Sequence, residues 1–487
     1  MKKYLTKTTL ILLTAIILSG CNDWLEVRPK TEIRAYDLFT SDQGFWDALT
    51  GIYIGMTDQR LYGRNLSWDA IEWMAWYHNS GNENSSWFQL QRYNFEDRTA
   101  IPFIDNVWSR MYNVISEINF LLWALDRFGH ILSTEVYNTV KGEALALRAF
   151  CHFDLIRLFA QGNLANNPAA FDRLTIPYVT EHSKHIVPQR TYRETINLLM
   201  KDVNEAIELL SQVRRPAATP YFTMNDLAAK LLRARIAQWT NDPNTVAYSA
   251  DLITSLMAGE SALRFWGNST VTDRNRHLPT EVMFGLDVFR LRTLMERAYI
   301  SHIGGSPNLN ILQNSVHFVD NDIFEVGREP IGVSPADIRI RGTMNWFSVE
   351  GSNKLFVKLQ QPADGAAINV VPLMRLSEAF LIYAESMIGT SNASAAIALN
   401  MLRIGGRGND LDYTLPDDLS DETLRRIIQQ EYRREFMQEG QLFFYYKRNG
   451  VLRIPGAPAG VGEMTNERYT LPFPIAEQEF GRVGMDK

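Results

Sequence analysis

The sequence predicts a mainly α-helical fold, a scaffold of tetratricopeptide-like helical pairs interrupted by a loop-rich insertion. Three observations predict it. Apolar residues recur at three- and four-residue spacings over long stretches, as they do on one face of an α-helix. Short polar turns separate these stretches, which favours antiparallel neighbours, although no clean repeat of tetratricopeptide length is present. The interval 265–372 lacks the helical period and is rich in Gly, Pro, Asn and Ser.

The predicted helices begin with two long ones. Residues 107–128 carry a single apolar stripe, whereas residues 143–160 are apolar over most of the circumference. A helix of the second kind is buried between other helices. Further helices are predicted over residues 191–210, 225–239, 245–258, 373–387, 393–402 and 424–437.

The insertion has a different pattern. Residues 281–289 and 354–359 alternate apolar and polar side chains, which predicts short strands. Long insertions on rigid scaffolds commonly carry function. We therefore divide the chain into a signal segment (1–20), an N-terminal helical part with the candidate binding loop (21–264), the insertion (265–372) and a C-terminal helical part of the same fold (373–487).

The N-terminus has the pattern of a bacterial lipoprotein signal. Three lysines in the first seven residues precede the apolar run 8–17, and Leu18-Ser-Gly-Cys21 follows. The run is too short to span a membrane as a helix, so it predicts a cleaved signal peptide. A cysteine directly after Leu-Ser-Gly is a lipobox. We expect acylation of Cys21, which would anchor the mature chain to a membrane.

Charge and cysteine content exclude several classes of function. Without residues 1–20, 46 basic and 55 acidic residues remain, a net charge of −9. This argues against nucleic acid or an anionic lipid surface as the partner, because both need a basic face. Cys151 is the second of two cysteines, so no disulfide is expected once Cys21 is acylated. In its apolar helix Cys151 is expected to be a small buried hydrophobe.

A set of motifs in order along the chain resembles the SusD/RagB family of outer-membrane nutrient-binding lipoproteins. No single motif is specific, but their order over nearly the whole chain is. Besides the lipobox they are Trp24-Leu25 with Pro29, Trp108…Tyr112…Ile115…Asn119, Gly142-Glu-Ala-Leu-Ala-Leu-Arg-Ala149, Ala228-Ala-Lys-Leu-Leu-Arg-Ala-Arg235, Arg375-Leu-Ser-Glu-Ala-Phe-Leu-Ile-Tyr-Ala-Glu385, Asn400-Met-Leu-Arg-Ile-Gly-Gly-Arg407, Glu431-Tyr-Arg-Arg-Glu-Phe-Met-Gln-Glu-Gly440 and Leu471-Pro-Phe-Pro-Ile475.

The resemblance implies a function and a partner. It implies display on the outer surface of the outer membrane, and capture of a ligand for a TonB-dependent barrel of the SusC type. Most members of the family bind glycans, and a peptide-binding branch exists. One departure concerns the positions after Glu439-Gly440, where the family usually has an arginine and, three residues on, an aspartate. Here these positions hold Leu442 and Tyr445.

Several charged motif residues are expected to have structural roles. Asp154 and Arg157 are three apart on one helical face, so they are expected to pair. Local pairs are likewise expected for Arg148 and among Arg375, Glu378 and Glu385. Residues 431–439 are expected to form a charged seam between helices. Buried networks of this type fix packing and rarely catalyse.

No motif indicates catalysis or a cofactor. His182 and His185 lack a third ligand, and Gly405-Gly-Arg-Gly408 follows a helix rather than a strand, so neither a metal site nor a phosphate loop is predicted. Whether a structural Ca²⁺ is bound is left open by the sequence. Asp69 and Glu72 could be imagined as the paired carboxylates of a surface glycoside hydrolase.

The candidate binding site is the stretch 68–87, which holds four of the eleven tryptophans. Sugar rings stack an apolar C–H face on indole or phenol rings, and their hydroxyls need amides or carboxylates. We expect an aromatic platform beside a polar loop, with Trp76 and Trp87 as the foremost contacts. The expected glycan-binding residues are Trp68, Trp73, Trp76, Tyr77, Asn79, Asn82, Asn84 and Trp87, and Trp266 and Trp346 could form an opposite wall.

Four hypotheses follow. The first is a cell-surface lipoprotein that binds a glycan and passes it to the barrel without making or breaking bonds. The others are a peptide-binding member of the same family, a surface glycoside hydrolase, and a lipoprotein that only stabilises a partner barrel.

Overall fold

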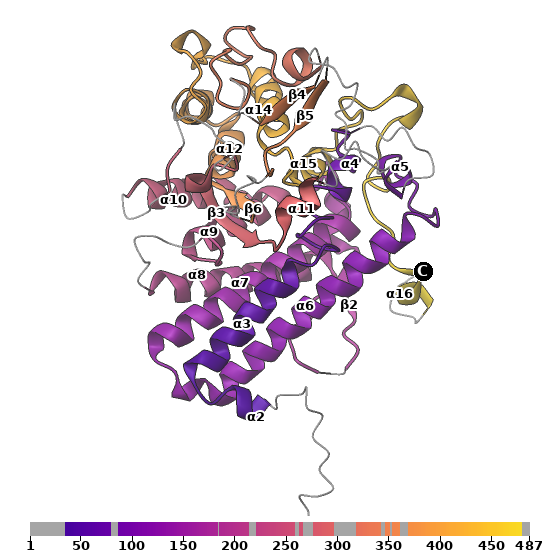
Figure 1. Ribbon diagram of the computed structural model, residues 1–487, viewed down its shortest axis with the longest axis vertical. Coiled ribbons are helices and arrows are strands. Elements are labelled where there is room, and N and C mark those ends of the chain that lie inside the picture. The colour runs from indigo at the N-terminus through magenta and orange to yellow at the C-terminus, as the bar shows by residue number, and fades with distance from the viewer. Residues whose placement is uncertain are drawn as a thin grey trace, which may run out of the picture.

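The computed structural model describes residues 35–78, 86–183, 185–213, 221–258, 263–265, 276–296, 318–341, 346–350, 353–360 and 369–479. All structural statements below concern these residues. Cys21 and the signal segment lie outside them, as do Asn79, Asn82, Asn84 and Trp266. The described part of the chain is mainly helical, which confirms the predicted class (Figure 1).

Most of the helix ends lie within a few residues of the ends that the sequence predicts. The N-terminal helices and those of the insertion are α2 (Ala35–Leu38), α3 (Asp42–Met56), α4 (Ala70–Met74), α5 (Ser86–Gln91), α6 (Ile101–Phe128), α7 (Thr134–Phe159), α8 (Tyr192–Ser211), α9 (Asp226–Thr240), α10 (Thr245–Met257) and α11 (Leu291–Met295). The C-terminal helices are α12 (Leu376–Met387), α13 (Asn392–Asn400), α14 (Asp421–Glu435), α15 (Gln441–Asn449) and α16 (Ile475–Glu479). A π-helical turn, Met401–Gly406, continues α13 and includes the first two residues of the segment 405–408, so this segment does follow a helix.

Helices that follow one another in the chain pack side by side. The series runs from α6 through α7, α8 and α9 to α10, and α10 then packs on α12 and α12 on α13. Figure 1 shows the long helices α6 and α7 in the lower half, with α12 and α14 above them. Every residue of α7 from 142 to 159, Cys151 included, is buried. The predicted burial of this helix between its neighbours is therefore confirmed.

Three two-stranded antiparallel sheets complete the fold. They pair β1 (Leu174–Pro177) with β2 (Gln189–Thr191), β3 (Val282–Asp287) with β6 (Val370–Arg375), and β4 (Phe347–Glu350) with β5 (Asn353–Phe356). β3 and β5 lie within or next to the predicted strands. The expectation that residues 373–375 begin a helix is wrong, because they belong to β6 and pair with β3.

One hydrophobic core runs through all three parts of the chain. Leu145 of the N-terminal part, Phe284 and Trp346 of the insertion, and Leu381 of the C-terminal part all belong to one cluster of buried residues. The insertion therefore packs as part of the scaffold rather than as a separate unit.

The charged motif residues pair between helices more often than along them. Asp154 and Arg157 make the expected local pair. Arg148, however, binds Asp202 of α8 with its Nε 2.7 Å from Oδ2. The expected pairing among Arg375, Glu378 and Glu385 is wrong. Glu378 binds Arg235 of α9, Glu385 binds Arg448 of α15, and Arg375 joins a network around α14. Apart from the Asp154–Arg157 pair, each of these contacts joins two different elements.

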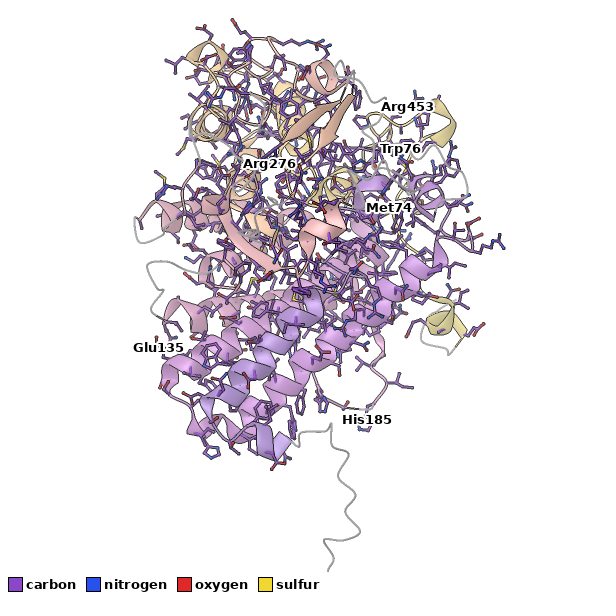
Figure 2. The ribbon with its side chains drawn as sticks, in the orientation of Figure 1. Met74, Trp76, Glu135, His185, Arg276 and Arg453 are labelled. Carbon is purple, nitrogen blue, oxygen red and sulfur yellow. The ribbon has the colours of Figure 1, made fainter. Side chains whose placement is uncertain are left out.

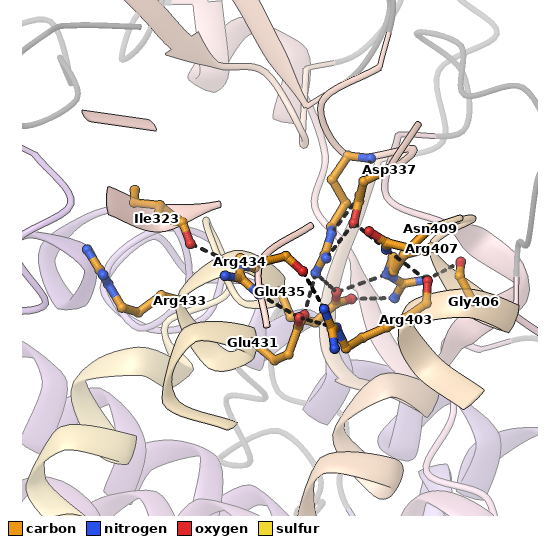
Figure 3. Close-up of polar contacts among 12 residues, drawn as sticks. Ile323, Asp337, Arg403, Gly406, Arg407, Asn409, Glu431, Arg433, Arg434 and Glu435 are labelled. Atoms are coloured by element: carbon orange, nitrogen blue, oxygen red, sulfur yellow. Dashed lines mark hydrogen bonds and ion pairs between the residues drawn. The ribbon is translucent and has the colours of Figure 1, made fainter. Parts of the chain in front are cut away.

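Glu435 is the centre of a buried ionic network. Its carboxylate lies 2.5 Å from Arg407, 2.6 Å from Arg375 and 3.1 Å from Arg339, and none of these side chains has exposed surface. Figure 3 shows Arg403, Arg407 and Arg434 converging on Glu431 and Glu435. We define the buried ionic network as Arg339, Lys358, Arg375, Arg403, Arg407 and Arg434 with Glu281, Glu325, Asp337, Glu431, Glu435 and Glu439.

The network joins the insertion to the C-terminal helices. Glu281 precedes β3 and binds Arg407 at 2.7 Å, whereas Arg375 ends β6 and binds Glu439 at 2.9 Å. Burial alone would raise the pKa of Glu431, but Arg339, Arg434 and Arg403 lower it to about 2. The expected charged seam over residues 431–439 is confirmed, and its role is to hold elements together.

Glu143 is a buried carboxyl group between α3 and α7. Tyr53 of α3 donates its hydroxyl hydrogen bond to Glu143 Oε2 at 2.5 Å and accepts one from the backbone N–H of Met224 at 2.9 Å. Burial raises the pKa of Glu143 to about 7, and the Tyr53 hydrogen bond offsets part of this shift. The folded protein therefore binds a proton here that the unfolded chain has lost by neutral pH.

This proton makes stability depend on pH. Because the pKa of Glu143 is raised to about 7 in the folded protein, protonation of this group stabilises the fold. This contribution is complete below the ordinary glutamate pKa and is lost as the pH rises through 7. Glu143→Gln keeps a neutral group, so its unfolding free energy relative to wild type should rise between pH 5 and pH 8. The difference should reach the order of 3 kcal/mol. Urea unfolding at both pH values measures it, and parallel profiles for the two proteins would contradict the assignment.

Candidate functional site

Four of the rings expected to bind a ligand lie in the core. Trp68, Trp73, Trp76 and Tyr77 are 1%, 0%, 4% and 2% exposed. Figure 2 places Trp76 and Met74 in the upper right of the molecule, near α4. Rings this deeply buried cannot stack against a ligand in this conformation. This corrects the expectation that they form an exposed platform: these rings are buried because residues 68–77 pack against α15 and hydrogen-bond to α14 and to the segment between the two helices.

Hydrogen bonds hold three of these four buried rings, Trp68, Trp73 and Tyr77, in fixed positions. Trp68 Nε1 donates to the carbonyl oxygen of Gly63 at 3.1 Å, and Trp73 Nε1 donates to Asp69 Oδ1 at 3.2 Å. The Tyr77 hydroxyl donates to the backbone carbonyl of Arg433 in α14. Burying these polar atoms with their bonds made avoids the cost of leaving them unpaired.

Glu72 joins the same stretch to the start of α15. Its two carboxylate oxygens accept hydrogen bonds from the backbone N–H groups of Gln438 and Gly440, each at 2.9 Å. Burial raises the pKa of Glu72 to about 8, although both N–H bonds act to lower it. Gly440 has φ +70°, and a Cβ there would lie 2.6 Å from the carbonyl oxygen of Leu66. Glycine at this position is thus required by the close approach of the two segments.

The two carboxylates of the hydrolase hypothesis are both committed to internal contacts. Asp69 and Glu72 are each 1% exposed. Asp69 pairs with Arg64 and accepts from Trp73, and Glu72 accepts from the backbone. Burial raises the pKa of Asp69, and Arg64 offsets part of that shift. Neither group is available to flank a glycosidic bond here.

Trp87 differs from the other rings of the stretch. It lies in α5, directly after residues 79–85, and is half-buried. The Arg64 guanidinium lies 5.8 Å from the Trp87 ring centre and 5.9 Å from that of Trp68, within cation–π range of both. Arg64 also forms an ion pair with Asp69, which is buried. This ion pair fixes the Arg64 guanidinium in position beside the Trp87 ring.

Arg64 was missed by the sequence analysis, and little in the sequence could have found it. It lies four residues before Trp68, a spacing that brings side chains together only in a helix. Residues 60–68 form turns, so the contact depends on the tertiary fold.

Trp346 does not form an opposite wall. It is 1% exposed, its Nε1 donates to the carbonyl oxygen of Arg276 at 2.6 Å, and Lys358 Nζ lies 3.9 Å from the ring centre. It therefore supports the core beside the buried ionic network.

The predicted histidine pair forms no metal site with other described residues. His182 and His185 are exposed, and Figure 2 shows His185 at the lower end of the molecule, away from Trp76. Among the described residues no group of three or more His, Cys, Asp or Glu side chains could hold a metal ion. Within the same ranges, no helix has the length and apolar character needed to cross a bilayer.

Two family models match the chain on either side of residues 238–333. One, described as starch-binding and associating with the outer membrane, matches residues 23–237, which include the stretch 68–87. The other, described as the SusD family, matches residues 334–482. The chain belongs to the SusD/RagB family. Residues 238–333, with the first part of the insertion, lie outside both matches.

Curated relatives of this SusD-type protein share part of its length. SusD-like protein P38 of Formosa agariphila is 25% identical over 251 residues, 50% of this chain and 44% of that protein. SusD-like protein P2 of the same organism is 27% identical over 160 residues, 33% of this chain and 30% of that protein. The matched region thus spans less than half of either relative.

Solved structures of SusD superfamily proteins share the fold over almost the whole chain. One from Bacteroides thetaiotaomicron is 21% identical with a TM-score of 0.68, covering 90% of this chain and 98% of that one. Another, from Bacteroides fragilis, is 19% identical with a TM-score of 0.70, covering 91% and 98%. A SusD-like carbohydrate binding protein from Bacteroides vulgatus is 18% identical with a TM-score of 0.62, covering 84% of each chain. These likenesses show the fold alone.

Proposed function

We propose that this protein is a lipid-anchored, cell-surface glycan-binding protein of the outer membrane that captures an oligosaccharide or polysaccharide and delivers it to a SusC-type TonB-dependent barrel. The observation that carries the proposal is Trp87, a half-buried ring beside Arg64 at the edge of a buried aromatic cluster. This ring lies inside the region matched by the family model described as starch-binding.

The chemistry at Trp87 suits a sugar. An indole ring offers an apolar surface to the C–H face of a pyranose, and a guanidinium offers several N–H donors to its hydroxyls. The segment 79–85 before α5 contains Asn79, Asn82 and Asn84, whose amides would add donors and acceptors. The buried rings Trp68 and Trp73 then act as a support that holds Arg64 and Trp87 in position.

The membrane and partner assignments rest on the lipobox and the family. Acylation of Cys21 would supply the anchor, and the family description supports association with the outer membrane. The partner is proposed to be a barrel because ligand captured at the cell surface needs a route across the outer membrane. Co-purification of the full-length tagged protein from detergent-solubilised outer membranes, with wild type compared to Cys21→Ala, tests both.

The proposed function involves no catalysis. Asp69 and Glu72 are occupied by Arg64, Trp73 and backbone N–H groups, which supports a binding role over hydrolysis.

A glycan array with the purified protein tests the function, followed by an affinity gel that contains the polysaccharide selected. The expected result is retardation in the gel without release of reducing ends over a long incubation. Release of reducing ends by clean protein would support the hydrolase instead. Binding to a peptide library but to no glycan would support the peptide-binding hypothesis. Binding to neither would favour a protein that only stabilises its barrel.

A further inference from the structure

A large groove with a mixed polar and apolar lining lies on the helical scaffold, apart from Trp87. Its volume is about 910 Å³, and residues of α9, α10, α12, α14 and α15 line it together with the loop after α7. None of residues 64–93 contributes to the lining. The volume is at the upper end of the range of about 300–1,000 Å³ typical of small-ligand pockets.

The charges that line the groove are nearly balanced. On its floor Arg448 binds Glu385 with both guanidinium nitrogens, at 3.0 and 2.7 Å, and Gln238 donates to the same carboxylate at 2.9 Å. Arg426 pairs with Glu325 outside the groove. Arg425 and Asp242 are the charged lining residues left, and they are of opposite sign. The groove therefore has no strong preference for an ion of either sign.

Amide side chains dominate the remaining polar surface. They are Asn163, Asn166, Gln238, Asn241, Gln429 and Asn449. Each amide offers both donors and acceptors, which matches a hydroxyl group that is itself donor and acceptor. Asn241 and Gln429 make no side-chain hydrogen bond to any other residue in the described ranges, so their amides are available to a ligand.

The departure at Tyr445 shapes this groove. Tyr445 packs against Tyr432 with ring centres 4.3 Å apart, and the Arg448 guanidinium lies 5.4 Å from its ring. An aspartate at 445 would lie one helical turn from Arg448 and compete with Glu385 for it. With tyrosine at position 445, Arg448 pairs with Glu385, and the two charges cancel. Tyr445 and Trp239 are only 6% and 3% exposed, so hydrogen bonds rather than ring stacking would hold a ligand.

We propose that this groove is a second sugar-binding subsite, which takes a neutral, hydroxyl-rich segment of a glycan through the amides of Asn241 and Gln429. The proposal rests on the proposed function and extends it, because two separate subsites raise the affinity for a long chain above that for a short one.

The test uses full-length protein and five neutral probes: maltohexaose, cellohexaose, laminarihexaose, xylohexaose and mannohexaose. The groove variant is Asn241→Gly with Gln429→Ala. Asn241 has φ +54°, which glycine adopts without strain, and residue 429 lies on a partly exposed helix face. A matched control removes two amides elsewhere, with Gln43→Ala and Asn466→Ala. Circular dichroism checks that each variant is folded.

Calorimetry should give two bound hexasaccharides per wild-type chain for at least one probe, and one per chain for both the groove variant and Trp87→Ala. The affinity for the polysaccharide built from the same repeating unit as the bound hexasaccharide should fall at least tenfold in the groove variant. In the control variant this affinity should stay unchanged. One hexasaccharide per wild-type chain, with an unchanged groove variant, would overturn the second subsite and leave the proposed function intact. If the single substitution Trp87→Ala abolished all saccharide binding, the second subsite would likewise be overturned and the proposed function would stand. Failure of every probe and of the glycan array would overturn both proposals.

Discussion

Replacing Glu435 by glutamine is expected to lower the free energy of unfolding by about 3–5 kcal/mol, the usual cost of removing one charge from a buried ion pair. Glu435 lies within 3.1 Å of Arg339, Arg375 and Arg407, all fully buried. Burial would raise the pKa of Glu435, but Arg407 and Arg375 hold it well below its ordinary range, so it is charged when folded. Glutamine keeps the volume and removes the charge, which leaves these cations undercompensated. Urea unfolding near neutral pH measures the loss.

Glu463 provides the control. It pairs with Arg453 at 3.2 Å, but the two side chains are 60% and 82% exposed. Exposed pairs contribute about 0–1 kcal/mol, so Glu463→Gln should leave the unfolding curve nearly unchanged. Equal effects of the two substitutions would show that the buried ionic network does not hold the fold together. Should Glu435→Gln fail to fold at all, its soluble yield relative to Glu463→Gln gives the same comparison.

Replacing Trp87 by alanine is expected to weaken glycan binding by roughly thirtyfold, or about 2 kcal/mol, the usual effect of losing an aromatic contact at the centre of a binding site. Trp87 is the half-buried ring of the stretch 68–87 and lies beside Arg64. Trp87→Phe should restore part of the affinity, because a smaller ring still stacks. Titration with the glycan selected on the array measures all three proteins.

Trp46→Ala is the matched control for this experiment. Trp46 is also a half-buried indole packed on the core, but it lies in α3, near the end of the molecule where α2 is drawn in Figure 1. Its loss should affect stability as much as that of Trp87 and leave affinity unchanged. If Trp46→Ala weakened binding equally, the effect of Trp87→Ala would be one of stability, and Trp87 would not be a contact.

Periodicity was enough to predict the helical scaffold. The stretch 143–160 reads as apolar on nearly all sides, and α7 is indeed buried along that length. The error at residues 373–375 has a simple cause, because Leu373 and Met374 are apolar residues directly before a true helix. Their strand partner, β3, lies about ninety residues earlier and leaves no local mark. Ion-pair partners were mispredicted for the same reason, as Arg375 meets Glu435 and Glu439 only through the tertiary fold.

The candidate site was predicted in part. Composition indicated that residues 68–87 are unusual, but it did not distinguish the buried rings Trp68, Trp73 and Trp76 from the half-buried Trp87, the proposed contact. Trp73 and Trp76 are buried because residues 70–77 pack against α15 and hydrogen-bond to α14 and to the segment that joins the two helices. The supporting role of Arg64 depends on its joint contact with Trp68, Asp69 and Trp87. The groove beside Tyr445 was not predicted; the sequence showed only a departure from the family pattern at that position.

The bonds of Glu72 have a consequence for the order of folding. Its partners, the N–H groups of Gln438 and Gly440, lie 366 and 368 positions further along the chain. Contacts this distant in sequence form late because a long loop must close first. Helices that are neighbours in the sequence can pack early, but α4 must wait for residues in the last tenth of the sequence to reach it. The packing around Trp87 is therefore completed last, and a chain truncated before Gln438 should form its other helices without completing the proposed glycan site.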